Sequence, residues 1–222
     1  MRSRHVERFN HDEDAAGYDR DVLDESDPIR AGYDDVLDWI AASAAAGPDS
    51  RVLELGSGTG NLSLRLPREA ELVCVDVSRE MTRIAREKLA GRSAVEFAKA
   101  DLLEYFDRPR PDFEPFDAVV SSYAVHHLCA DEKARLFERI TARLRPAGRA
   151  VFGDLMFENQ AARREILASY RSSGREALAA DIEDEFFWDV DHATGTLRGL
   201  GLRATAKRFS ELSWGIAAER AR

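Results

Sequence analysis

Short apolar runs alternate with amphipathic, helix-like segments through the middle of the chain. The strand-like runs are RVLEL (51–55), ELVCVDV (71–77), AVEFAKA (94–100), FDAVVSS (116–122) and RAVFGDL (149–155). Between them, SREMTRIAREKLA (78–90) and ADEKARLFERITARL (130–144) repeat apolar residues with the period of a helix. Because parallel strands need crossovers of this kind, the pattern predicts an α/β protein with a mostly parallel sheet covered on both faces.

Capping and breaking residues set the boundaries of the two helices. Ser78 and Asp131 stand at their starts, where a side-chain oxygen can accept a backbone N–H of the first turn. We therefore expect both residues to be N-caps. Pro146, followed by Gly148, is expected to end the second helix before the strand at 149–155.

The two ends of the chain differ from this middle part. Residues 1–47 are expected to carry one or two helices and to form a lid, and residues 48–155 to form the core of the sheet. Within 156–222, EILASYRS and DVDHATGTLRGLG look helical, and 202–220 splits into two strand-like runs, which suit a hairpin at the sheet edge. FDRPRPDFEPF (106–116) is expected to be a surface loop.

A chain of 222 residues with 44% apolar residues can bury one full core, so we predict a single domain.

Composition narrows the class of protein. No apolar run approaches the roughly 20 residues that cross a bilayer, and the charged N-terminus does not resemble a signal peptide, so we expect a cytoplasmic protein without membrane contacts. Cys74 and Cys129 show neither a disulfide framework nor metal-ligand spacing, and no metal is expected. A net charge of −9 disfavours nucleic acid as a partner. The sequence leaves open whether the protein is a monomer or a homodimer.

Glycines 56, 58 and 60 follow the first strand on alternate positions. Without a Cβ they permit a tight turn and let a ligand approach the main chain. A tight strand-to-helix turn with nothing bound is the alternative, and it explains Gly56 better than all three glycines. Asp76, at the end of the second strand, can accept hydrogen bonds from both hydroxyls of a ribose. The dinucleotide pattern G-x-G-x-x-G does not fit, because position 61 is Asn.

Five motifs occur in a characteristic order: ELGSGTG, VDVS, the pair Ala100-Asp101, FDAVVSSYAVHHL and LRPAGRAVFGDL. Together they resemble the successive motifs of class I S-adenosylmethionine-dependent methyltransferases. The chain is most similar to small bacterial members of that superfamily without an assigned acceptor, which also carry an N-terminal motif like AGYDRDV. The resemblance implies a Rossmann-like fold with a mostly parallel seven-stranded sheet, helices on both faces and an antiparallel edge strand.

The resemblance also implies which residues contact S-adenosylmethionine. The backbone of the three glycines would lie against its methionine part, Asp76 would hold the ribose, and Asp101 would accept the adenine amino group. Helix core remains an alternative role for Met81 and for Tyr18, and an N-cap role for Asp101 is compatible with binding. The full predicted set is Tyr18, Glu54, Gly56, Ser57, Gly58, Gly60, Asp76, Val77, Met81, Asp101, Leu102, Ser121 and Ser122.

The loop after the fourth strand, SSYAVHHL, is expected to lie beside the transferred methyl group, because ligands of open parallel sheets bind at the carboxyl ends of strands. Tyr123, His126 and His127 are its candidate catalytic residues, and one histidine could take a proton from the acceptor. The alternative is that the histidines pack or line the pocket without ionising. The Asn-Pro-Pro-Tyr and Asp-Pro-Pro-Tyr loops of amino-group methylases of nucleic-acid bases are absent from this sequence, so we expect a small-molecule acceptor.

Two further clusters lie near the expected acceptor side. Phe186, Phe187 and Trp188 could line an apolar pocket, but we expect at least two of them to be core residues. For Asp154 and Glu158 we expect helix capping and a solvated helix start.

These observations predict transfer of a methyl group from S-adenosylmethionine to a small nucleophile by in-line displacement, with release of S-adenosylhomocysteine. Two alternatives keep the cofactor. One is a sensor or scaffold that binds it without turnover, and the other is an enzyme that transfers a different group of it.

Overall fold

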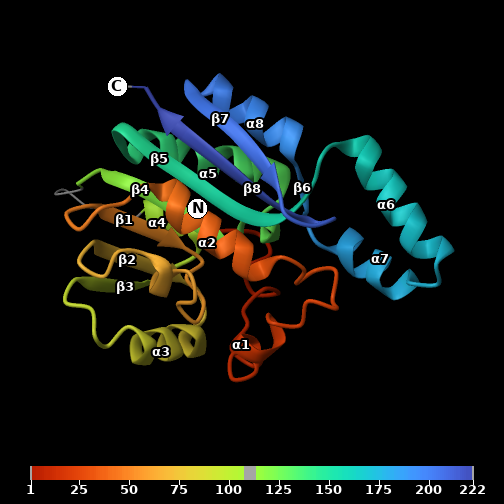
Figure 1. The fold of residues 1–222 in the computed structure, drawn as a ribbon, viewed down its shortest axis with the longest axis horizontal. Helices are drawn as coiled ribbons and strands as arrows, with labels where there is room; N and C mark the ends of the chain where they lie inside the picture. The colour runs from red at the N-terminus through yellow and green to blue at the C-terminus, as the bar shows by residue number, and fades with distance from the viewer. Residues whose placement is uncertain (1, 108–113, 222) are drawn as a thin grey trace.

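The central sheet of the computed structural model runs in the order β3-β2-β1-β4-β5-β8-β7 (Figure 1). The structure describes residues 2–107 and 114–221, so most of the expected loop at 106–116 lies outside the described residues. Strands β1 to β5 are mutually parallel, and β8 runs antiparallel to both of its neighbours, β5 and β7. The two-residue strand β6 pairs with β5 off this path. The strand bounds are β1 Arg51–Leu55, β2 Glu71–Asp76, β3 Val95–Lys99, β4 Phe116–Ser122, β5 Leu144–Phe157, β6 Trp188–Asp189, β7 Leu202–Arg208 and β8 Ser213–Arg220. The predicted α/β class, the mostly parallel sheet and the terminal hairpin are confirmed.

Alternating strand residues feed two separate cores because successive side chains point to opposite faces. Leu53 and Leu55 of β1 pack on one face beneath α4 (Leu102–Asp107), α5 (Ala130–Arg143) and α8 (Val190–Gly199). Val52 faces the other side, with α2 (Tyr33–Ala44) and the short η1 (Ser63–Arg65). Helix α3 (Arg79–Lys88) follows β2 and contacts β2 and β3. The sheet is thus covered on both faces.

The helix boundaries agree with the sequence at one predicted cap and not at the other. Ser78 caps α3, and its Oγ accepts the Met81 N–H at 3.1 Å. The N-cap of α5 is Cys129 rather than Asp131, because the Glu132 carboxylate reaches back to the Cys129 N–H in a capping box. Helix α5 ends at Arg143, and β5 begins at once, so Pro146 and Gly148 lie in the irregular start of that strand.

The C-terminal part contains one helix more than the sequence pattern predicted. Both expected helices are present, as α6 (Gln160–Ser172) and α8, and α7 (Glu176–Asp184) lies between them. Helices α6 and α7 form a pair at the far end of the sheet (Figure 1). Within the described residues, no helix combines the length and apolar character needed to cross a bilayer.

The N-terminal part is tied to the glycine loop by one carboxylate. Asp19, in the short helix α1 (Tyr18–Asp21), accepts hydrogen bonds from Thr59 Oγ1 at 2.6 Å and Asn61 Nδ2 at 3.0 Å. The same carboxylate forms an ion pair of 2.6 Å with Lys88 of α3. One side chain therefore joins α1, the loop after β1 and α3.

Helix α2 packs against the sheet through a notch made by two facing glycines. Gly153 of β5 and Gly215 of β8 are direct cross-strand partners. A Cβ added at Gly153 would lie 2.3 Å from Val36 Cγ1, and one added at Gly215 would lie 2.2 Å from the Trp39 ring. The helix therefore requires the absence of a side chain at both positions.

We predict that Gly153→Ala destabilises the protein by about 1–3 kcal/mol, because the added methyl group overlaps α2. Gly195→Ala in α8 is the control, since a Cβ there meets no atom within 4 Å. It is expected to leave the stability unchanged or to raise it by up to about 1 kcal/mol. Urea denaturation measures both free energies of unfolding, and equal effects of the two substitutions would contradict the notch.

Candidate functional site

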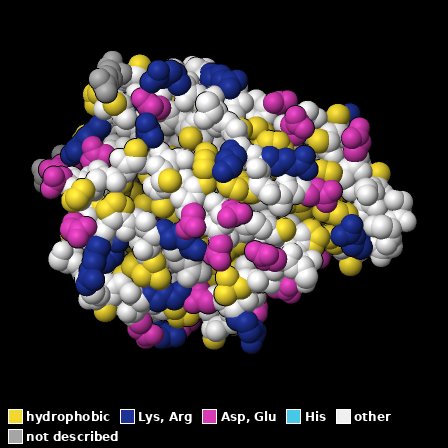
Figure 2. Space-filling view, in the orientation of Figure 1, with side chains coloured by type: hydrophobic (Ala, Val, Ile, Leu, Met, Phe, Trp, Pro, Cys, Tyr) yellow, Lys and Arg dark blue, Asp and Glu magenta, His cyan; other side chains and the backbone are white. Residues whose placement is uncertain are grey.

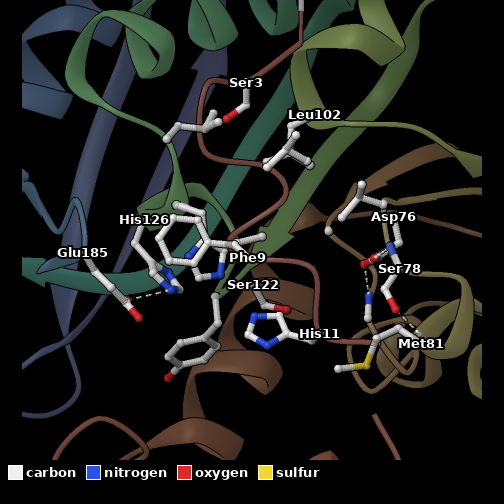
Figure 3. Close-up of a pocket in the computed structure, with 18 of the residues that line it drawn as sticks. Ser3, Phe9, His11, Asp76, Ser78, Met81, Leu102, Ser122, His126 and Glu185 are labelled. Carbon is white, nitrogen blue, oxygen red and sulfur yellow. Dashed lines mark hydrogen bonds and ion pairs between the residues drawn. The ribbon is translucent and has the colours of Figure 1, made fainter. Parts of the chain in front are cut away.

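A cavity opens at the edge of the sheet where β1, β2 and β4 end (Figure 3). These parallel strands all present their carboxyl ends there. Most of the predicted site residues line the cavity: Tyr18, Gly56, Gly58, Asp76, Val77, Met81, Asp101, Leu102, Ser122, Tyr123, His126 and His127. Residues predicted from five separate motifs therefore share one surface.

The three glycines have left-handed backbone conformations, with φ of 70°, 52° and 85°, but different surroundings. A Cβ at Gly56 would lie 2.3 Å from the Ala124 Cβ, so its absence lets the loop after β4 approach. A Cβ at Gly58 would meet no atom within 4 Å, and Gly58 faces the cavity. Gly60 does not line the cavity, because it packs against Ala85 of α3.

Three more predicted cofactor residues lie behind the cavity surface: Glu54, Ser57 and Ser121. The Ser121 Oγ donates to the Leu55 carbonyl at 2.7 Å, which joins β4 to β1. The Ser57 N–H donates to the Val75 carbonyl at 3.0 Å and holds the glycine loop against β2. These residues support the loop and its neighbouring strand and do not line the cavity.

Glu54 lies under the loop with no exposed surface. Its carboxyl group accepts the Ser63 hydroxyl, and Oε1 has no hydrogen-bond partner among the described residues. Burial raises the pKa of Glu54 to about 8, so the group is largely protonated at neutral pH.

The Asp76 carboxylate is held at the cavity by two backbone donors. Its Oδ2 accepts the Gly58 N–H at 2.7 Å, and its Oδ1 accepts the Ser78 N–H at 2.8 Å. Burial raises the pKa of Asp76, while these two hydrogen bonds oppose the rise. Each oxygen keeps a second lone pair for a ligand hydroxyl. Met81, one turn into α3, is buried and also lines the cavity, so core packing and ligand contact coexist there.

Asp101 caps helix α4, as the alternative interpretation proposed. Its Oδ1 accepts the N–H groups of Leu103 at 2.9 Å and Glu104 at 3.3 Å. The Ser3 N–H donates to the same oxygen at 3.1 Å. Among the described residues all of these bonds fall on Oδ1, which leaves Oδ2 for a ligand donor.

The N-terminal part, where the sequence predicts a helical lid, contributes a cover of the cavity that is not helical. Residues 3–12, which we call the cover segment, place Ser3, Phe9 and His11 around it (Figure 3). The segment is attached at its end by Asp12, whose Oδ1 accepts the Ser78 hydroxyl at 2.5 Å and the Glu80 N–H at 3.1 Å. It is built of turns, and its sequence has neither helical nor strand periodicity that could have indicated this position.

Tyr123 begins the loop after β4 in a left-handed conformation, with φ of 47°. Its ring stacks on Tyr33 with centroids 5.2 Å apart, and its hydroxyl lies 3.3 Å from the Ser213 Oγ. Burial raises the pKa of the Tyr123 phenol. The phenol is therefore protonated at neutral pH and unsuited to act as a base.

His126, in the 3-10 turn η2 (Val125–His127), is held between two carboxylates. Its Nδ1 lies 2.5 Å from Asp154 Oδ1, and its backbone N–H donates to Asp154 Oδ2 at 3.0 Å. Its Nε2 lies 3.3 Å from Glu185 Oε2 (Figure 3). The expectation that Asp154 caps a helix was wrong: Asn159 caps α6, and Asp154 orients the His126 ring.

His127 presents a neutral imidazole. The ring stacks on Phe9 with centroids 4.1 Å apart and lies 4.0 Å from the His126 ring. Burial, and the nearby imidazoles of His126 and His11, lower the pKa of His127 well below 6.5. Its Nδ1 is buried without a hydrogen-bond partner among the described residues.

The expectation that at least two of the aromatic residues at 186–188 are core residues is confirmed. Phe187 and Trp188 are buried, and Trp188 packs against Phe137 and Phe152. Glu185, just before them, does line the cavity. No sequence motif pointed to Glu185, which reaches the histidines through the fold alone.

Comparison with known proteins identifies the family. A methyltransferase domain family matches residues 52–148. An uncharacterized methyltransferase of Geobacillus kaustophilus is 32% identical over 92% of this chain and 89% of its own length. The uncharacterized methyltransferase YrrT of Bacillus subtilis is 35% identical over 82% of each chain. A solved complex, DhpI with SAM and HEP, shares the fold with a TM-score of 0.68 and 20% identity, over 94% of this chain and 93% of that one.

Three findings agree on the family: the order of the strands, the glycine loop held by Asp76, and relatives above 30% identity over most of the chain. This chain belongs to the class I S-adenosylmethionine-dependent methyltransferases.

Proposed function

We propose that the enzyme methylates a small molecule that enters the cavity beside His126 and His127. The bound cofactor supplies an electrophilic methyl carbon on a sulfonium. In-line transfer of this methyl group to a lone pair of the acceptor would leave S-adenosylhomocysteine as the second product. The chain contributes alignment of the two molecules and a covered pocket.

The observation that carries this proposal is the continuity of the cavity. The same cavity is lined by Asp76, Met81 and Asp101 and by Tyr123, His126 and His127. Figure 3 shows Asp76 and Met81 on one side of it and His126 on the other. The first set suits the cofactor: a carboxylate for the ribose diol, a thioether for the adenine face, and an oxygen of Asp101 for the adenine amino group. The open space beside Gly58 suits the close approach of the methionine part.

The supporting residues fit the same assignment. Tyr18, Val77, Leu102 and Ser122 also line the cavity. We assign Val77 and Leu102 to the adenine, Ser122 to the methyl group, and Tyr18, the first residue of α1, to the roof of the pocket. We assign Glu54, Ser57, Gly60 and Ser121 to the support of the glycine loop and the loop after β4.

We also propose that residues 1–47 act as a lid within a single domain, with 48–155 as the cofactor-binding core and 156–222 as cap helices and final strands. The cover segment supports this, because Ser3 contacts Asp101 at the adenine end and Phe9 contacts His127 at the acceptor end. A lid in this position limits the size of the acceptor.

The choice of a small acceptor rests on the covered cavity and on charge. The chain carries 41 acidic and 32 basic residues. Acidic and basic side chains are interspersed over the face shown in Figure 2. This distribution suits a small acceptor better than a polyanionic one.

Asp76→Asn tests the cofactor assignment. We expect the affinity for S-adenosylmethionine to fall about 10- to 100-fold, because charge-assisted hydrogen bonds to the ribose are lost. Glu71→Gln, at the opposite end of β2, is the matched control, since Glu71 pairs with Arg51 on the surface. Calorimetric titration measures both, and an unchanged affinity of the Asp76 variant would refute the assignment.

His127→Gln tests the acceptor end. We expect kcat to fall about 100-fold or more if the neutral imidazole receives the acceptor proton, while cofactor affinity stays unchanged. His192→Gln, an exposed histidine of α8 outside the cavity, is the control. An unchanged kcat would assign catalysis to positioning alone.

Release of S-adenosylhomocysteine across a panel of small alcohols, thiols and amines tests turnover itself. We expect release with at least one class of acceptor. Cofactor binding without release on any acceptor would favour a sensor, and release without acceptor methylation would favour transfer of another group.

A further inference from the structure

Two histidines and one glutamate converge at the acceptor end of the cavity. His126 and His127 come from η2, and Glu185 follows helix α7. One ring nitrogen of each histidine and one oxygen of Glu185 all lie within 4.8 Å of one another. Figure 3 shows His126 and Glu185 facing each other from these separate elements.

The contact between His126 and Glu185 is long for a hydrogen bond and suitable for two ligands of one ion. Its Nε2–Oε2 distance is 3.3 Å. Two ligand atoms at about 2.0–2.1 Å from a tetrahedral cation are separated by roughly 3.3–3.4 Å. The two atoms therefore already have the spacing of a shared metal ion.

Asp154 directs a lone pair of His126 toward this point. The short contact of Nδ1 with Asp154 Oδ1 makes Nδ1 a proton-bearing nitrogen and fixes the direction of Nε2. The Nε2 lone pair then faces the Glu185 carboxylate, and two acceptors repel each other unless a proton or a cation lies between them. A carboxylate that orients a histidine in this way is the usual outer partner of a metal-binding histidine.

His127 supplies the third ligand. Its Nδ1 has no partner among the described residues although the atom is buried, so a ring nitrogen is uncommitted. Leaving such a group unsatisfied in the interior destabilises the fold, and a bound ion would offset this cost.

We propose that His126, His127 and Glu185 bind one divalent cation of the class that prefers imidazole ligands, such as Zn²⁺. Two neutral imidazoles and one carboxylate leave a fourth position of a tetrahedral ion open, as in catalytic zinc sites. The charges of Glu185 and Asp154 balance those of the ion. All three residues line the cavity, from which an acceptor would reach that position.

The role of the ion rests on the proposed methyl transfer. A hydroxyl or thiol of the acceptor occupies the open position and loses its proton to solvent water, because the cation stabilises the anion. Its lone pair then forms the bond to the methyl carbon as the C–S bond breaks. The fall in kcat expected for His127→Gln then has a second cause, loss of a metal ligand, and Zn²⁺ titration of this variant separates that role from the role of a base.

Zn²⁺ titration of the full chain, without a polyhistidine tag and stripped with a chelator, tests the site in the absence of cofactor and acceptor. We expect one ion per chain. Glu185→Gln and His127→Gln are expected to weaken binding about tenfold or more, and Asp154→Asn about 10- to 100-fold through its effect on His126. The matched controls Glu183→Gln and His192→Gln are expected to bind like wild type, since Glu183 pairs with Arg171 at the surface.

The outcomes separate the two proposals. Absence of Zn²⁺ binding to the wild-type chain, or equal affinity of wild type and Glu185→Gln, overturns the metal site. Glu185 is 32% exposed, so its substitution is expected to preserve folding, which the melting temperature checks. Failure of the chain to bind S-adenosylmethionine would refute the proposed function and leave the metal result unaffected.

Discussion

The Asp76 carboxylate is the contact on which the cofactor end of the site depends. Its two oxygens accept the N–H groups of Gly58 and Ser78, so one side chain fixes the glycine loop to the start of α3. With the loop in this position, Gly56 leaves room for Ala124, and the loop after β4 can lie beside it. The glycine loop, Asp76 and the loop after β4 come together because they follow the carboxyl ends of parallel strands. The buried Asp76 carboxylate then fixes the Gly58 and Ser78 N–H groups by hydrogen bonds.

A second carboxylate has the same function at the acceptor end. Asp154, at the end of β5, holds both the backbone and the ring of His126. Because Asp154 is buried, the orientation of the ring is set by the sheet and not by solvent. The neighbouring His127 is covered by Phe9, so the N-terminal segment completes a site whose remaining parts come from the sheet. The two proposed ends of the site, for cofactor and for acceptor, thus depend on acids of two different strands.

The sequence predicted the parts of the fold that depend on local pattern. The period of the apolar residues and the turn residues located the helices α3, α5, α6 and α8 and all strands except the two-residue β6, and Ser78 was identified as a cap. Prediction failed where a neighbour decided the outcome. Glu132 moved the cap of α5 from Asp131 to Cys129, and α7 was missed because EALAADIED follows an exposed turn without a clear start signal. The position of the cover segment depends on contacts with Asp101 and Ser78, far away in the chain.

By itself, the sequence determined the class of fold, the family motifs and a set of candidate site residues, because these follow from periodicity and from residues adjacent to strand ends. Only the tertiary structure decided which of them face the cavity. It placed Glu54 and Ser121 behind the surface and brought Glu185 to His126 across 59 positions of the chain. Such contacts join segments with no shared local pattern, and they arise when both faces of the sheet are covered and the buried polar groups find partners.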